Sequence, residues 1–284
     1  MGCALWFASL QVLRAMTPFE TALPVDALRV GYDGKAAQKL ARDIAVETAI
    51  NIVYAPVPYA VMMASPQDLQ DFAIGFSLTE GIIDHADDIR SVNIETEERG
   101  LRLVVTLASD LLQRHLGRSR AMAGRTGCGL CGIDDLKNLP QAKAIARHAA
   151  PLALASVHRA LLGLEARQPL NAATRAVHAA AYANAYGEIL LLREDVGRHN
   201  ALDKMIGAAL RAGIDPADGF VLVTSRCSFE MVEKAAIFGA AIIVAISAPT
   251  SLAIERAQAH GMGLMAVARP DSGMIFCNEQ MFAG

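Results

Sequence analysis

The strongest constraint on the fold of this chain is a repeating order of short apolar runs and longer amphipathic stretches over residues 188–267. Each apolar run has the length of a strand, and each amphipathic stretch ends near a glycine, where helices commonly stop. Apolar strands of this kind are typical of a sheet that helices cover on both faces. The pattern predicts an α/β domain with a mostly parallel sheet. The expected strands are 189–192, 220–223, 241–246 and 264–267, and the expected helices are 199–212, 229–238 and 249–259.

The residues before this repeat follow a different pattern. Short apolar runs at 44–53, 57–63, 91–95 and 101–107 surround one expected helix, 67–80, which Pro66 opens and Gly81 ends. We therefore predict a small α+β domain over residues 17–122, with Met1 and Met16 both open as the start of the chain. The α/β domain follows over residues 123–284. Two further stretches, 134–148 and 156–164, have helical spacing.

Composition excludes several classes of partner and compartment. The net charge is −3, the aromatic content is 5% and there is one tryptophan, so we expect no binding of nucleic acid polymers. The first fifteen residues are too short and too polar to span a bilayer, so no membrane association is expected. Five cysteines are an odd number in a long apolar-rich chain, which favours a reducing compartment, the cytoplasm.

A glycine-rich segment, 114–132, carries the sharpest chemical motif, Thr126-Gly127-Cys128-Gly129-Leu130-Cys131-Gly132. Glycines and arginines in this segment predict a mobile loop, and nearby Arg125 favours the thiolate form of the two cysteines. An accessible thiolate on such a loop suits sulfur transfer or disulfide exchange. A structural zinc site, a redox dithiol and a pair of buried thiols remain alternatives, although Cys3, Cys227 and Cys277 form no second pair of zinc ligands.

Polar residues follow the predicted strands at what should be one edge of the sheet. Ligands of open α/β sheets bind at the carboxyl ends of the strands, where helix N-termini also point. Arginines, hydroxyls and helix N-termini together would suit a phosphate-rich ligand such as a nucleotide. Ordinary strand-to-helix turns with N-caps are the alternative explanation. The segments concerned are 194–200, which contains Arg198 and His199, 224–226 with Arg226, 247–250 with Ser247 and Thr250, and 269–271 with Arg269.

His178 lies in Thr174-Arg175-Ala176-Val177-His178-Ala179-Ala180, which we interpret as the start of a helix of small residues. Zinc deaminases have a ligand histidine followed two positions later by a proton-shuttling glutamate. Here Ala180 stands at that position and the cysteine pair precedes the histidine, so deaminase chemistry lacks its acid–base group. His178 is then either a core or cap histidine or a site residue.

Together these motifs resemble the FdhD/NarQ family, the formate dehydrogenase accessory sulfurtransferases, over about residues 44–277. The departures are Arg175 and Ala176, where the family usually has two glycines, and Asp271 with Ser272, where some members have glycine and arginine. The resemblance rests on Cys128-Gly129-Leu130-Cys131-Gly132, His178-Ala179-Ala180-Ala181, the long block from Arg193 to Lys204, the block from Ser225 to Ala235, and Ser247-Ala248-Pro249-Thr250-Ser251-Leu252-Ala253.

The resemblance implies a cytoplasmic homodimer whose three-layer domain is cytidine-deaminase-like but has lost its zinc, so that no metal site is expected. It implies a sulfurtransferase that accepts persulfide sulfur from a cysteine desulfurase. The sulfur then passes to the molybdenum bis(molybdopterin guanine dinucleotide) cofactor, which formate dehydrogenase needs. Cys128 would carry the persulfide and Cys131 would assist. The family's cofactor-binding segment corresponds to Val267, Ala268, Arg269, Pro270, Asp271 and Ser272, and guanosine diphosphate (GDP) would mimic part of the ligand.

Overall fold

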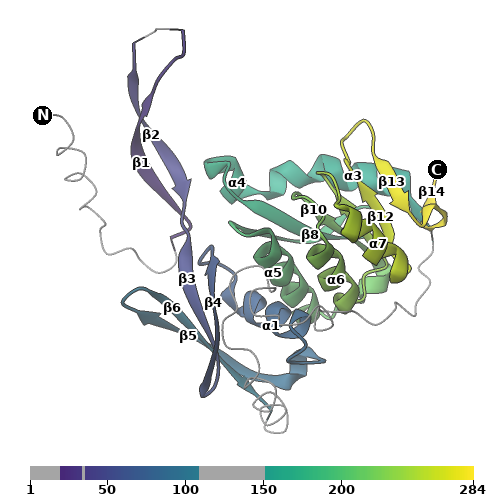
Figure 1. The fold of residues 1–284 in the computed structure, drawn as a ribbon, viewed down its shortest axis with the longest axis horizontal. Helices are drawn as coiled ribbons and strands as arrows, with labels where there is room; N and C mark the ends of the chain where they lie inside the picture. Colours follow the sequence, from purple (N-terminus) through teal and green to yellow (C-terminus); the bar gives the residue numbers. More distant parts are fainter. Residues whose placement is uncertain (1–19, 34–35, 109–150) are drawn as a thin grey trace, which may run out of the picture.

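The computed structural model describes residues 20–33, 36–108 and 151–284, which form a projecting hairpin, a four-stranded sheet and a six-stranded sheet with helices (Figure 1). In these ranges no helix is both long enough and apolar enough to cross a membrane. The predicted helix 134–148, the predicted mobile loop and the predicted domain boundary at residue 122 all lie outside the described residues.

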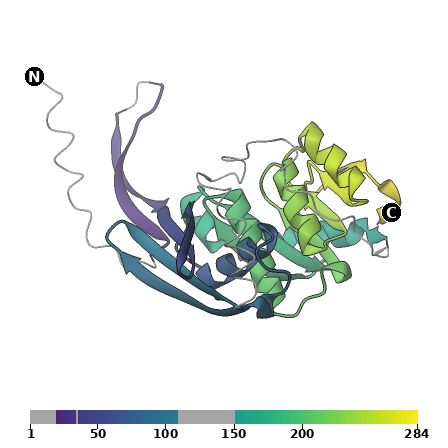
Figure 2. The same cartoon turned by 60° about the horizontal axis from the view of Figure 1, so that its bottom comes forward.

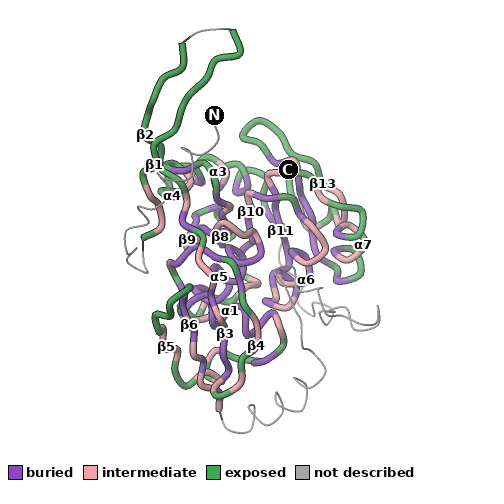
Figure 3. The backbone as a smooth tube through the Cα atoms, turned by 60° about the vertical axis from the view of Figure 1, so that its left-hand side comes forward, coloured by how far each residue is buried: buried purple, intermediate pink, exposed green. Residues whose placement is uncertain are grey.

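The hairpin consists of β1 (Ala22–Arg29) and β2 (Gln38–Ala45), which pair in antiparallel register. Both strands are largely exposed, and the hairpin stands away from the rest of the molecule (Figure 3). It touches the body at α4 (Pro169–Thr174), where Arg42 Nη2 donates to the carbonyl of Thr174 over 3.5 Å. The sequence analysis missed this hairpin, and the strand expected over 44–53 is instead divided between the last two residues of β2 and most of β3 (Thr48–Tyr54).

The four-stranded sheet has the order β4-β3-β6-β5, with α1 (Leu69–Thr79) against it. The expected helix 67–80 is therefore real but shorter, and Gly81 follows its end with the positive φ of 67° that glycine tolerates. The four predicted strands of this region are also present with shifted ends. Their bounds are β3 (Thr48–Tyr54), β4 (Val57–Ala64), β5 (Ile89–Glu97) and β6 (Gly100–Leu107).

The six-stranded sheet is mixed, which corrects the prediction of a mostly parallel sheet. Its order is β13-β12-β11-β10-β8-β9, and parallel pairing is confined to β10–β11 and β11–β12. The pairings β8–β10, β8–β9 and β12–β13 are antiparallel. The four predicted strands, now β9, β10, β11 and β12, all run in the same direction, and the sheet is mixed because of β8 and β13, which the sequence analysis did not predict as strands. The strands are β8 (His178–Asn184), β9 (Ile189–Asp195), β10 (Gly219–Val223), β11 (Ile242–Ala245), β12 (Gly263–Ala266) and β13 (Met274–Cys277).

Helices cover both faces of this sheet. On one face lie α5 (Arg198–Arg211), α6 (Phe229–Phe238) and α7 (Ser251–Ala259), and on the other lies α3 (Leu154–Leu164) (Figure 2). Successive side chains of a strand point to opposite faces of its sheet, so β8 contributes to a core on each face. Ala180 and Tyr182 belong to the core under α5 and α6, whereas Ala181 and Ala183 belong to the core under α3. The predicted helices 199–212, 229–238 and 249–259 are confirmed, although α7 begins at Ser251 rather than Pro249. The remaining elements are the parallel pair β7 (Leu152–Ala153) and β14 (Phe282–Ala283), and the 3-10 turns Ala86–Asp88, Glu165–Arg167, Pro216–Asp218 and Glu279–Met281.

The two sheets share one apolar core because α1 lies between the four-stranded sheet and α5. Phe72 and Phe76 of α1 belong to the same buried cluster as Leu202 and Met205 of α5. The helices approach so closely that a Cβ added at Gly75 would collide with the carbonyl oxygen of Asp203. A core of this kind fixes the first half of the chain rigidly against the six-stranded sheet.

Candidate functional site

The strand ends of the six-stranded sheet meet at one edge, as the sequence predicted for the segments after β9, β10, β11 and β12. His178 begins β8 and pairs with Asp195, the last residue of β9. Thr224, after β10, donates its backbone N–H to Ala179 over 3.0 Å. Ser247, after β11, accepts from the N–H of Val267 over 3.2 Å. These bonds bring the start of β8 and the carboxyl ends of β9, β10, β11 and β12 into one continuous rim.

His178 is the first residue of a strand, not the start of a helix as expected. The polypeptide reaches it through Arg175, which follows α4 with a left-handed φ of 56°, a conformation that glycine adopts more easily. The imidazole is half-buried, and its pKa is lowered from the ordinary value of 6.5 by burial and then by the positive charges of Arg198 and Arg226. The rim thus places two arginines beside an imidazole whose pKa is lowered by burial and by their charge.

Two buried polar atoms near this cluster have no hydrogen-bond partner among the residues that the structure describes. They are Nε of Arg198, the first residue of α5, and Oγ of Ser228, the N-cap residue of α6. Buried donors without partners are rare in proteins because leaving them unpaired is costly. A ligand that presents acceptor oxygens at this edge would satisfy them. The guanidinium group of Arg226 is on an exposed residue.

The segment after β12 was expected to bind the cofactor, but part of it is engaged in bonds to its own backbone. Val267 has a φ of 53°, which is an unfavourable conformation for a β-branched residue and marks local backbone strain. The guanidinium of Arg269 donates to the carbonyl oxygens of Ile246 and Ala268, so part of its donor capacity is already used. The N–H of Arg269 donates to Ser272 over 2.7 Å and closes a turn whose residues are exposed.

The other predicted ligand residues are dispersed. His199 and Ala268 are buried, with exposures of 8% and 1%. Thr250 caps α7 by accepting from the N–H of Ala253 over 3.3 Å, and Ser247 is half-buried. The structure therefore brings His178, Arg198 and Arg226 together and gives Thr250 the ordinary capping role that the sequence analysis kept as an alternative.

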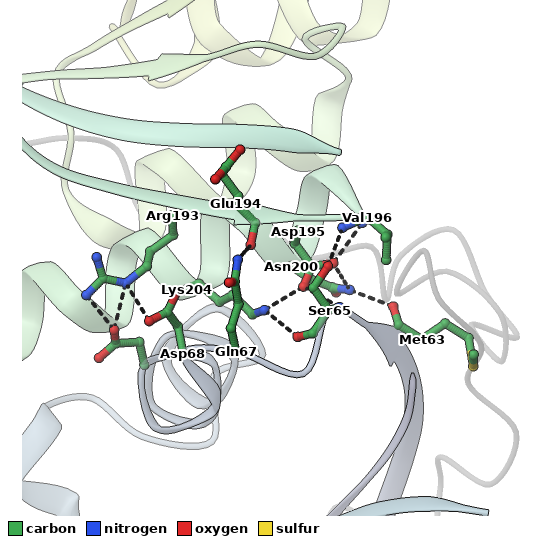
Figure 4. Close-up of polar contacts among 12 residues, drawn as sticks. Met63, Ser65, Gln67, Asp68, Arg193, Glu194, Asp195, Val196, Asn200 and Lys204 are labelled. Carbon is green, nitrogen blue, oxygen red and sulfur yellow. Dashed lines mark hydrogen bonds and ion pairs between the residues drawn. The ribbon is translucent and has the colours of Figure 1, made fainter. Parts of the chain in front are cut away.

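The block from Arg193 to Lys204 proves to be largely a junction with the first half of the chain (Figure 4). The carboxylate of Asp195 accepts from the backbone N–H of Ser65 over 3.0 Å and pairs with Lys204 Nζ at 2.6 Å. Asn200 Nδ2 donates to Asp195 and to the carbonyl of Met63, over 3.1 and 2.8 Å. Charged residues within a helix that is otherwise apolar from Ala201 to Leu210 were the signal that could have revealed this buried network.

A cavity of about 420 Å³ opens beside this junction, between the start of α1, β9 and the end of α5. Arg193 and Arg211 line it, and both guanidinium groups pair with the carboxylate of Asp71, at 2.8 and 2.6 Å. The edge of the sheet that carries His178, Arg198 and Arg226 is called the basic edge below. Because the arginines and the acidic groups of the cavity neutralise one another, the cavity is a weaker candidate for a phosphate ligand than the basic edge.

Cys128 and Cys131 lie outside the described residues. Among those described, Cys227 and Cys277 are free, and no group of three or more metal-ligating side chains occurs. Burial raises the pKa of the Cys227 thiol to about 12, so it remains protonated and behaves as a small apolar side chain. Neither of the two has the environment of a reactive thiolate.

Comparison with known proteins places the chain in a family. The profile of the FdhD/NarQ family matches residues 45–283. The chain belongs to the FdhD/NarQ family. Relatives named sulfur carrier protein FdhD include one from Bordetella petrii, 44% identical over 89% of this chain and 90% of that protein. Another, from Xanthomonas euvesicatoria pv. vesicatoria, is 45% identical over 84% of both chains.

The architecture of this FdhD/NarQ chain also has a counterpart among solved structures. A crystal structure described as a formate dehydrogenase accessory protein from Desulfotalea psychrophila aligns with a TM-score of 0.71 and 25% identity. The alignment covers 93% of this chain and 100% of that one. The mixed α/β arrangement with several sheets is therefore shared with that protein.

Proposed function

We propose that this FdhD/NarQ protein is a sulfurtransferase that accepts persulfide sulfur from a cysteine desulfurase and delivers it to the molybdenum bis(molybdopterin guanine dinucleotide) cofactor for formate dehydrogenase. Membership of the family and the names of its relatives, sulfur carriers, support the sulfur-carrying part. The name of the structural neighbour supports the link to formate dehydrogenase. The observation that carries the cofactor part is the basic edge of the sheet, where His178 lies among the positive charges of Arg198 and Arg226.

The chemistry of this edge fits a nucleotide substrate. A guanine dinucleotide carries phosphate oxygens that accept charge-assisted hydrogen bonds, and arginine is the residue best suited to give them. The buried Nε of Arg198 and the hydroxyl of Ser228 are donors that such oxygens would satisfy. Arg269 has fewer donors to offer because its guanidinium already binds two backbone carbonyls. We therefore assign the main phosphate contacts to Arg198 and Arg226.

In this proposal the sulfur is transferred in two steps, each of which is the attack of a cysteine thiolate on a persulfide. First, the Cys128 thiolate attacks the terminal sulfur of the desulfurase persulfide, which leaves a Cys128 persulfide and a desulfurase thiolate. The Cys131 thiolate then attacks the inner sulfur of that persulfide. This forms a Cys128–Cys131 disulfide and releases sulfide, which replaces an oxygen ligand on the substrate's metal while that oxygen leaves as water. A cellular dithiol would reduce the disulfide before the next cycle.

A second candidate is a cofactor chaperone that uses Cys128 and Cys131 only to clamp its cargo. The same basic edge would support it, since a chaperone also needs to hold the nucleotide. Sulfur loading separates the two, because a carrier gains a sulfur atom from a desulfurase and a clamp does not.

Titration of GDP into the protein tests the nucleotide site. Replacing Arg226, an exposed residue, by alanine should weaken GDP binding by about 1.5–3 kcal/mol, the usual contribution of a hydrogen bond to a charged group. Calorimetry with the wild-type protein and Arg226→Ala measures the difference, and guanosine alone serves as the ligand that lacks phosphate. Equal affinity of the two proteins for GDP would move the phosphate site elsewhere.

We further propose that the six-stranded sheet with its helices is a cytidine-deaminase-like domain without deaminase chemistry. Ala180, where the sequence comparison puts the proton-shuttling glutamate of the deaminases, is an interior residue of β8 with an exposure of 1%. The homodimeric state and the cytoplasmic location are also part of this proposal. Sedimentation of the purified protein tests the first, and fractionation of cells that express the full chain tests the second.

A further inference from the structure

The short link between β9 and α5 presents Arg198 to the basic edge. It consists of Val196 and Gly197, and its conformation decides where the first side chain of α5 points. The backbone N–H of Gly197 donates to Asp195 Oδ1 over 2.7 Å, which ties the link back to the end of β9. A Cβ at Gly197 would lie 2.8 Å from Asn200 Nδ2, so the link is also closely packed.

A residue from the other sheet holds the same link from the opposite side. Ser65 directly follows β4, and its hydroxyl accepts from the N–H of Val196 over 3.1 Å. Its backbone N–H donates to Asp195 Oδ2 over 3.0 Å, and its carbonyl accepts from Lys204 Nζ over 2.8 Å. Every polar group of Ser65, which is fully buried, therefore contacts the segment 195–204, and its carbonyl also accepts from the N–H of Gln67 over 2.8 Å.

Asp195 is the centre of this arrangement (Figure 4). Its carboxylate receives hydrogen bonds from Ser65, Gly197 and Asn200 and pairs with Lys204. A buried carboxylate with four donors around it has a single well-defined position, because losing any donor leaves charge uncompensated. The link that carries Arg198 is thereby fixed to the rigid core of both sheets.

We propose that Ser65 and Asp195 are positioning residues for the basic edge: they hold the Val196–Gly197 link so that the Arg198 guanidinium stays beside His178. The inference rests on the proposed function, because it assigns a purpose to the placement of Arg198. It predicts that the first half of the chain contributes to anion binding although none of its described residues has been assigned a ligand contact. The simpler alternative is that the same bonds only fasten the two sheets together.

The side chain of Ser65 offers a narrow test, since Ser65→Ala removes only the acceptor for Val196 N–H and keeps the backbone bonds. The measurement is the His178 pKa, obtained by NMR titration of the full chain with pH. The wild-type protein is compared with Ser65→Ala, Arg198→Ala and the double variant. The His178 signal is assigned as the one that His178→Gln lacks. Arg198→Ala and Ser65→Ala should both raise the His178 pKa toward 6.5, because a positive charge leaves its neighbourhood. The double variant should show no further rise.

Thr79→Val is the matched control. The Thr79 hydroxyl donates to Asp203 over 2.7 Å and accepts from Lys234 over 2.8 Å, so this change weakens the contact between α1 and α5 without touching the link. It should leave the His178 pKa unchanged. If Ser65→Ala lowers the melting temperature so far that it cannot be titrated, Ser65→Cys, whose thiol is only a weak acceptor for the Val196 N–H, gives the same comparison without a change of charge.

GDP affinity supplies the second readout. Ser65→Ala should weaken GDP binding about fivefold, the ratio expected for one neutral hydrogen bond, while Thr79→Val should not change it. An unchanged His178 pKa in Ser65→Ala together with a raised one in Arg198→Ala would overturn the positioning role. A shift of the His178 pKa in Thr79→Val as large as that in Ser65→Ala would overturn it as well. If the wild-type protein binds no GDP, the proposed function fails, yet the titration of His178 still decides whether Ser65 and Asp195 position Arg198.

Discussion

The ammonium group of Lys204 lies 2.6 Å from the carboxylate of Asp195, and both side chains are fully buried. Lys204 reaches Asp195 from the second turn of α5 and also donates to the carbonyl of Ser65. Burial lowers the pKa of Lys204, and the negative charge of Asp195 opposes that shift. Because Ser65 of the first half bonds to both residues, the ion pair stabilises the contact between the two halves only as long as both partners are present.

Replacing Lys204 by methionine should therefore destabilise the protein by about 3–5 kcal/mol, because the Asp195 carboxylate would stay buried without its cation. Urea unfolding at neutral pH measures the change. Arg159→Met is the control, since Arg159 and Glu188 form a pair at 2.9 Å that is more than half exposed. Exposed pairs usually contribute less than about 1 kcal/mol. Equal losses in the two variants would contradict the assigned role of Lys204.

The crossing of α1 and α5 gives a second prediction. A Cβ at Gly207 would collide with the carbonyl oxygen of Asp71, just as one at Gly75 would collide with Asp203. Gly207→Ala should lower the free energy of unfolding by about 1–3 kcal/mol or more, because the helices would have to separate. Gly163→Ala in α3 provides the comparison: its Cβ would meet Ile189 Cδ1 at an ordinary 3.8 Å.

Gly163→Ala should be neutral or stabilising by up to about 1 kcal/mol, since alanine is the better helix former. Thermal unfolding of both variants measures this difference. A Gly207→Ala variant as stable as Gly163→Ala would show that the two helices are not held at the observed distance.

Arg198 at the basic edge and Arg269 in the segment after β12 should differ in their effect on nucleotide binding. Arg198 has a buried Nε without a partner in the described structure, whereas the Arg269 guanidinium binds the carbonyls of Ile246 and Ala268. Arg198→Ala should weaken GDP binding by about 1.5–3 kcal/mol. Arg269→Ala should weaken it less and lower stability instead. Calorimetry combined with thermal unfolding gives both quantities, and the reverse order of the GDP affinities would argue for the segment after β12 as the main phosphate site.

Nucleotide affinity should also depend on pH through His178. Burial and the two arginines lower its pKa below 6.5 in the free protein, and a phosphate beside the ring would raise it again. Binding then takes up a proton, so affinity should rise as pH falls from the pKa of the bound state toward the lowered pKa of the free state. The nucleotide's own phosphate also titrates near pH 6, and His178→Gln retains that contribution.

Calorimetry of GDP binding in buffers of different ionisation enthalpy counts the protons taken up. The wild-type protein should take up more protons than His178→Gln throughout that pH window. The same proton count in both proteins would place His178 away from the phosphate.

The sequence predicted the secondary structure of the C-terminal half well because each expected strand and helix had its own apolar period and a glycine or N-cap at its end. It missed the two strands that make the sheet mixed: the small residues at the start of β8 were interpreted as the start of a helix, and β13 was assigned to no element. The hairpin β1–β2 was missed because it packs against little and so has few buried positions to produce a pattern.

The candidate site was predicted in part for a similar reason. The strand ends converge as the α/β rule requires, so Arg198 and Arg226 could be placed at one edge from the sequence. Whether a polar residue faces a ligand or a neighbouring element depends on tertiary packing. His199 is buried, and Asp195 and Lys204 serve the junction with Ser65, which only the three-dimensional structure reveals.

The most direct test of the sulfur-carrier function is the intact mass of the full chain after incubation with a cysteine desulfurase and cysteine. The wild-type protein and Cys131→Ala should each gain one sulfur atom, which a thiol reductant removes, and Cys128→Ala should gain none. The persulfide should be longer-lived on Cys131→Ala because the attacking thiolate is missing. Equal loading of Cys128→Ala and the wild-type protein, or no loading of Cys131→Ala, would contradict the assignment of Cys128 as the sulfur carrier.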